Sequence, residues 1–107
     1  MRMITEADLR QAVETLVDRF RPDRVILFGS QVRGTADTRS DVDLLVVCPI
    51  RGSRRALQVA MDRALRGCRF ARDIVIVTQE EYERDRHIPG AVARPAWLEG
   101  RVLYERP

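Results

Sequence analysis

Residues 28–43 read FGSQVRGTADTRSDVD. In this stretch Gly29 and Ser30 follow a short apolar run, and the motif Asp41-x-Asp43 appears ten residues later. Glycine allows a backbone to approach a phosphate closely, and the free amides at the start of a helix attract anions. The layout therefore predicts a site that holds a nucleoside triphosphate at one end and divalent metal at the other.

The carboxylates are the candidate metal ligands. Asp41 and Asp43 are alternate residues of an expected strand, so both project from one face, about 6.6 Å apart along the chain. Two carboxylates at that separation can bracket a pair of metal ions. Asp73 heads a later apolar run, 74–77, and offers a third carboxylate. Oxygen ligands without His or Cys favour Mg²⁺ or Mn²⁺ over zinc. The alternative is that these are ordinary turn and strand-edge aspartates.

Gly29, Ser30 and Arg33 are the candidate nucleotide-binding residues. A Gly-Ser pair alone is an ordinary turn, and no Walker-type Gly-Lys-Ser/Thr follows it, so the downstream Asp-x-Asp motif gives it meaning. Arg33 either reaches triphosphate oxygens or bonds across the loop. Arg39 and Ser40 are expected to shape the loop before Asp41.

The flanking segments predict an α+β fold. Apolar spacing predicts helices over 5–20, 53–66, a short stretch from residue 78, and a segment between 89 and 99. The expected strands are 25–28, 42–48, 74–77 and 102–104, with 42–48 central because it is apolar on both faces. Pro95 interrupts the last helix, which therefore begins near this residue or bends there.

Size and composition indicate a globular protein. The chain has 107 residues and a mass of 12.3 kDa, with 45% apolar and 33% charged residues. We expect one domain, residues 1–107. No apolar run approaches the ~20 residues needed to cross a bilayer, and no signal peptide is evident, so we expect a cytoplasmic protein without membrane contact. Cys48 is expected to be a buried thiol, and Cys68 and His87 are not expected to take part in chemistry.

All 19 basic side chains are arginines, and the net charge is +3. Every basic side chain therefore carries a planar guanidinium, which can form paired hydrogen bonds with a phosphate or a carboxylate. A lysine nucleophile is excluded. The arginines look scattered along the sequence, so no direct nucleic-acid binding is expected.

The motif GSQVRGTADTRSDVDLLVV, with Asp73 heading a later strand, resembles that of the minimal nucleotidyltransferases of the DNA polymerase β superfamily. The closing AWLEGRVLYE is similar to their C-terminal helix and strand. The resemblance implies a polymerase β-like nucleotidyltransferase fold, a small mixed sheet of about four strands flanked by helices. Gln31 and Val32 depart from the usual Arg-Ala type of pair, and Pro95 is a second departure.

Many such proteins are antitoxins of a HEPN-domain ribonuclease toxin. The resemblance implies transfer of AMP from ATP to a tyrosine hydroxyl of that partner, and a hetero-oligomer with it. Gly29 and Ser30 would hold the phosphates, and Asp41, Asp43 and Asp73 would coordinate two Mg²⁺ ions. Asp73 is either a general base or only a metal ligand.

Two other functions stay open. The first is a non-catalytic module that masks a HEPN partner by docking alone, which a degraded motif would favour. The second is a small-molecule adenylyltransferase. Such enzymes usually carry a further acceptor-binding domain, and we expect none in 107 residues. A protein acceptor is therefore the leading expectation.

Overall fold

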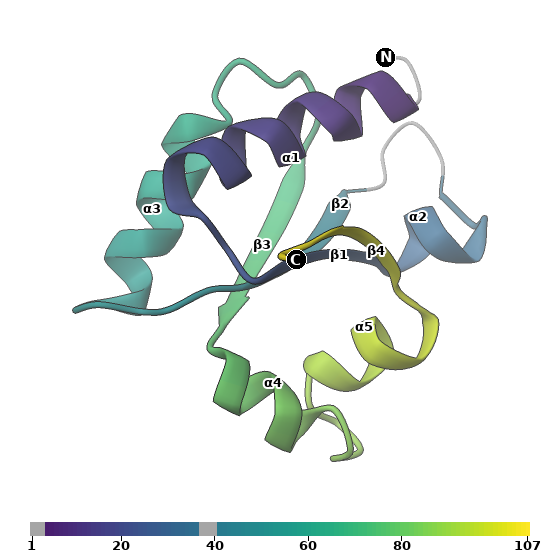
Figure 1. Ribbon diagram of the computed structural model, residues 1–107. Coiled ribbons are helices and arrows are strands. Elements are labelled where there is room, and N and C mark those ends of the chain that lie inside the picture. Colours follow the sequence, from purple (N-terminus) through teal and green to yellow (C-terminus); the bar gives the residue numbers. More distant parts are fainter. Residues whose placement is uncertain (1–3, 37–40) are drawn as a thin grey trace.

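The computed structural model describes residues 4–36 and 41–107 as helices above and below a sheet (Figure 1). The expected contributions of Arg39 and Ser40 lie outside the described residues. In chain order the elements are α1 (Glu6–Phe20), β1 (Arg24–Phe28), α2 (Ser30–Arg33), β2 (Val42–Val47), α3 (Arg54–Ala64), β3 (Arg72–Val77), α4 (Gln79–Asp85), α5 (Ala93–Glu99) and β4 (Arg101–Glu105).

The four strands form one mixed sheet in the order β3-β2-β1-β4. β1 pairs antiparallel with both β2 and β4, whereas β2 and β3 run parallel. The parallel pair requires a crossover, which α3 supplies between the two strands. β2 has a neighbour on each side, as its apolar composition predicted. The α+β class and the four-stranded mixed sheet are therefore confirmed.

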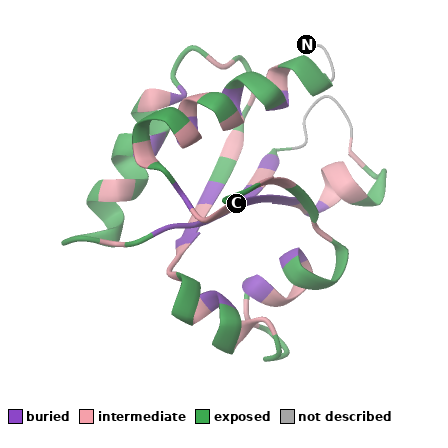
Figure 2. Cartoon of the chain, in the orientation of Figure 1, coloured by how far each residue is buried: buried purple, intermediate pink, exposed green. Residues whose placement is uncertain are grey.

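The sheet is covered on both faces, and burial is concentrated in its strands (Figure 2). Alternate residues of β2 point to opposite faces. Leu44 and Val46 pack with side chains of α1 and α3 in one core. Leu45 and Val47 belong to a second core, which includes Tyr82 of α4 and Ala96 of α5. The carboxylate of Asp43 shares the face of this second core, because it alternates with Leu44.

The helix boundaries follow the expected local signals. Thr5 and Asp8 form a capping box at the start of α1, and Thr78 and Glu81 form another at α4. Pro95 is the third residue of α5. The first turn of a helix makes no intrahelical N–H bond, so proline costs little there. Of the two alternatives for Pro95, a helix that begins close to it is the one observed.

The outer edge of β3 is closed by side chains of α3. Arg54 Nη1 donates to the carbonyl of Ile76 at 2.7 Å, and Gln58 Nε2 donates to that of Ile74 at 2.9 Å. Arg54 also forms a paired contact with Glu81, at 2.9 and 2.7 Å. An exposed strand edge invites pairing with other chains, and these side chains occupy its acceptors.

We expect the Arg54–Glu81 pair to stabilise the fold in a pH-dependent way. Hydrogen bonds from Arg54 and from the Thr78 amide lower the pKa of Glu81 from 4.5 to about 2. Its contribution to stability is therefore present above pH 4.5 and is lost as the pH falls towards 2. Glu81→Gln should lower the free energy of unfolding at neutral pH by about 1 kcal/mol, since the pair is partly exposed.

Urea unfolding of Glu81→Gln and of the parent chain, at neutral pH and near pH 2, measures this effect. Glu14→Gln, which changes an exposed carboxylate on α1, is the matched control and should alter neither value. A deficit of the same size at both pH values would contradict the assignment.

Candidate functional site

The site residues gather at one end of the sheet, where β1 ends and β2 and β3 begin. Asp43 pairs in register with Phe28 of β1 on one side and with Asp73 of β3 on the other. Directly paired residues of neighbouring strands present their side chains to the same face. Asp41 lies two residues before Asp43, immediately ahead of β2. The structure thus brings the three predicted carboxylates to the same end of the α4–α5 face.

Asp43 is the electrostatic centre of this group. Its pKa is raised above the ordinary value of 3.8, first by burial and then by the charges of Asp73 and Asp41, while Arg33 opposes the shift. Asp41 and Asp73 are exposed, whereas Asp43 is half-buried. The three carboxylates therefore repel one another, and a bound cation would reduce that repulsion.

Gly29 lies against the Asp43 carboxylate. Its backbone has φ +79°, a conformation that L side chains rarely adopt, and a Cβ placed there would lie 2.2 Å from Asp43 Oδ2. Only glycine fits this position without movement of the aspartate. The Gly-Ser pair and the Asp-x-Asp motif, ten residues apart in sequence, are therefore in contact in the fold.

Ser30 begins α2, a single turn of four residues. The helix is too short for its dipole to attract anions strongly, because the dipole is a sum over aligned peptides. Gly29 itself is buried, so the phosphate-binding potential rests on the half-buried Ser30 hydroxyl beside it. Ser30 is half-buried and has no side-chain hydrogen bond within the part of the chain that the structure describes.

Arg33 pairs with a residue of another element, a contact that neither of the two alternatives for this side chain included. Its Nη1 lies 3.6 Å from Oε2 of Glu99, the last residue of α5, and both side chains are about half exposed. Its positive charge nevertheless acts to lower the pKa of Asp43. The sequence analysis missed Glu99. The contact depends on how α5 packs beside β1, and no local sequence pattern predicts that packing.

The three carboxylates suit a hard divalent cation in chemistry but are not preassembled as a metal cluster. Asp41, Asp43 and Asp73 provide only oxygen donors, and burial together with the charges of Asp73 and Asp41 raises the pKa of Asp43. Among residues 4–36 and 41–107, no group of three His, Cys, Asp or Glu side chains already has the arrangement of a metal site. The donor set therefore fits Mg²⁺ or Mn²⁺, with side-chain adjustment on binding.

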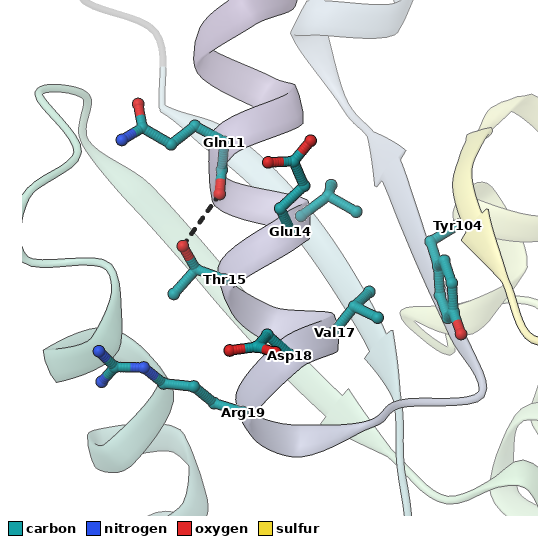
Figure 3. Close-up of a pocket in the computed structure, with 8 residues that line it drawn as sticks. Gln11, Glu14, Thr15, Val17, Asp18, Arg19 and Tyr104 are labelled. Carbon is teal, nitrogen blue, oxygen red and sulfur yellow. Dashed lines mark hydrogen bonds between the residues drawn. The ribbon is translucent and has the colours of Figure 1, made fainter.

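A pocket elsewhere on the molecule does not involve these residues. It has a volume of about 710 Å³ and lies between the outer side of α1 and Tyr104 of β4 (Figure 3). Thr15 donates a hydrogen bond to the Gln11 carbonyl at 3.0 Å within it. Because α1 covers the opposite face of the sheet from Asp43, this pocket takes no part in the candidate site. The described helices include none long and apolar enough to span a bilayer.

Comparison with known families identifies the class of protein. Residues 9–94 match the nucleotidyltransferase domain, and the chain belongs to this family. The resemblance drawn from the Gly-Ser and Asp-x-Asp motifs is thereby confirmed. No match was found among curated proteins.

Solved structures share the fold. One is a protein from Sulfolobus solfataricus that is assigned as a nucleotidyltransferase, with a TM-score of 0.64 and 22% identity over 94% of this chain and 79% of the other. Another is a toxin-antitoxin with AMP-PNP, with a TM-score of 0.67 and 17% identity over 96% of this chain and 75% of the other. At these identities the likeness establishes a common fold.

Proposed function

We propose that this nucleotidyltransferase transfers AMP from ATP to a hydroxyl, most simply a tyrosine, of a HEPN-domain toxin and thereby acts as its antitoxin. The observation that carries the proposal is the position of Asp43. It lies against the Gly29 backbone and in register with Asp73, so the phosphate-binding and carboxylate parts of the motif form one site.

Each site residue has a specific role in the proposed reaction. The Gly29 backbone and the Ser30 hydroxyl hold the β- and γ-phosphates of ATP. Asp41, Asp43 and Asp73 would hold two Mg²⁺ ions, or Mn²⁺, which supply Lewis-acid charge stabilisation when bound. The acceptor oxygen attacks the α-phosphorus, the bond to the β-phosphate oxygen breaks, and pyrophosphate leaves. In this proposal Asp73, which is exposed at the start of β3, accepts the hydroxyl proton.

A protein acceptor is supported by the surface beside the site. Four of the large apolar side chains that the described residues expose lie on α5 and the segment before it: Ile88 (46%), Val92 (46%), Trp97 (39%) and Leu98 (58%). Glu99, the next residue, is the partner of Arg33. This concentration of exposed apolar side chains in one segment of the chain favours protein docking there. The fold shared with a toxin-antitoxin structure points the same way.

Docking without catalysis is the second candidate, because it needs only the exposed apolar side chains of α5 and the preceding segment. The retained contact between Gly29 and Asp43 favours the transferase, since a module that only docks has no need of this strained glycine. A small-molecule acceptor has no comparable observation in its favour.

The test uses the chain together with a HEPN-type protein encoded beside it. Both proteins are incubated with Mg-ATP, and their intact masses are measured. A gain of one or more AMP units on the partner, abolished in the Asp43→Asn variant, supports the proposal. A stable complex without any gain in mass would instead establish docking alone.

Arg33→Gln should weaken ATP use without weakening the fold. The loss of a cation beside the triphosphate should raise the KM for ATP about tenfold, equivalent to about 1.4 kcal/mol, with little change in kcat. Glu99→Gln removes the same ion pair but keeps the cation, so its KM should not rise. An equal rise in KM in both variants would instead show that Arg33 acts only through its ion pair with Glu99.

A further inference from the structure

Positive charge is segregated on this molecule. Residues 51–72 contain seven arginines and one aspartate, a net charge of +6, whereas the whole chain carries +3. The remaining residues are therefore net −3. Most of this basic segment is α3 and its flanks, which cover the face of the sheet opposite Asp43. This surface is separate from the candidate site.

Folding brings further arginines to the start of this segment. A pocket of about 410 Å³ is lined by Arg51 and by three further arginines, Arg19, Arg21 and Arg106, and by no carboxylate. Arg106 is partly engaged, since it lies 3.6 Å from Asp23 and donates to the Arg21 carbonyl. The other three form no ion pair within residues 4–36 and 41–107. Uncompensated guanidinium groups around a cavity are typical of an anion site.

The outer side of α3 continues the positive charge. Arg55 and Arg63 are exposed, form no ion pair among the described residues and project from one side of the helix, and the exposed Arg66 lies in the turn that follows it. Val59 and Asp62 share this side, and Asp62 is paired with Arg72. The small residues Ala56 and Ala60 lie beside this stripe and allow close approach of a ligand. Eleven residues of helix are about 16 Å long, enough to meet several successive phosphates.

We propose that the arginine pocket and the α3 stripe bind the phosphate backbone of a nucleic acid. An acidic protein would offer similar charge, but protein interfaces bury an apolar centre. Val59 is the only large apolar side chain exposed on α3, whereas the others exposed in the described chain lie between residues 88 and 102. Interfaces with nucleic acids are more polar and strongly basic, as this surface is.

This proposal revises the expectation of no direct nucleic-acid binding. The arginines look scattered in sequence because those of the pocket come from residues 19, 21, 51 and 106. The end of α1 and the two segments that follow β2 and β4 converge only in the folded chain. The proposal does not depend on the transferase activity, because it uses the other face of the sheet.

The test is the salt dependence of binding to a short DNA duplex, measured by fluorescence anisotropy on the full chain. About five phosphate contacts predict a slope of log K against log salt of about −4 to −5. Arg51→Gln and Arg63→Gln, in the pocket and the stripe, should each reduce the magnitude of the slope by about one. Arg94→Gln on α5 removes one charge outside this surface and should leave the slope unchanged.

Each outcome decides the proposal. Salt-dependent binding that weakens in Arg51→Gln and Arg63→Gln but not in Arg94→Gln supports it. No binding to the duplex at low salt would overturn it. Equal losses in all three variants would also overturn it, because that pattern reports net charge and not this surface. Binding of pyrophosphate without binding of the duplex would restrict the pocket to free phosphates and overturn the nucleic-acid assignment.

Discussion

Asp43→Asn is expected to abolish nucleotidyl transfer while leaving the fold intact. The carboxylate lies against Gly29, and Asp43 pairs in register with Asp73. Loss of such a ligand removes several kcal/mol of charge stabilisation, so transfer should fall by about 10³-fold or more. The amide is nearly isosteric with the carboxylate, so packing should not change.

Stability should respond in the opposite sense to activity. Burial and the charges of Asp73 and Asp41 raise the pKa of Asp43, so its ionised form is unfavourable in the folded chain. The parent protein therefore loses stability as the pH rises from the unfolded pKa through the raised folded pKa. At neutral pH the asparagine variant should unfold at an equal or higher urea concentration than the parent.

The control for Asp43→Asn is Asp18→Asn, which changes an exposed carboxylate on α1, on the opposite face of the sheet. It should retain transfer and stability. Transfer that survives in Asp43→Asn, or a large loss of stability in that variant, would contradict the role assigned to this carboxylate.

Gly29→Ala is expected to have the second largest effect. A methyl group there would lie 2.2 Å from Asp43 Oδ2 on a backbone with φ +79°. The carboxylate or the strand end must shift, which should cost about 1–3 kcal/mol in the free energy of unfolding. Displacement of Asp43 should also reduce transfer strongly, because catalytic groups tolerate little misplacement.

Gly52→Ala separates the two causes. Gly52 also has positive φ, +85°, but a Cβ there meets no atom within 4 Å. It should lose about 1 kcal/mol of stability from the backbone alone and keep full transfer activity. An equal loss of transfer activity in Gly29→Ala and Gly52→Ala would contradict this explanation. It would show that the close contact with Asp43 is not the reason why position 29 requires glycine.

Local sequence signals predicted most of the fold. The capping boxes at Thr5 and Thr78 fixed two helix starts, and the continuous apolar run of β2 identified the central strand. The short connection between the end of β1 and the start of β2 brings the Gly-Ser and Asp-x-Asp motifs into contact, and their role as a nucleotide and metal site stays a prediction. These features depend on residues close together in the chain.

The remaining features depend on distant residues. The register of Asp43 with Asp73 is set by the parallel crossover through α3, and no short pattern encodes it. The ion pair of Arg33 with Glu99 depends on the packing of α5. Lack of metal preassembly among the described carboxylates is likewise a matter of three-dimensional arrangement that spacing does not report.

The phosphorus atom that reaches the acceptor distinguishes nucleotidyl transfer from any other use of ATP at this site. The chain and a HEPN-type protein encoded beside it are incubated with Mg-ATP labelled at either the α- or the γ-phosphorus. We expect the α label to become covalently attached to the second protein and the γ label to leave as pyrophosphate, with neither event in Asp43→Asn. Attachment of the γ label, or of no label while the two proteins remain bound, would contradict this expectation.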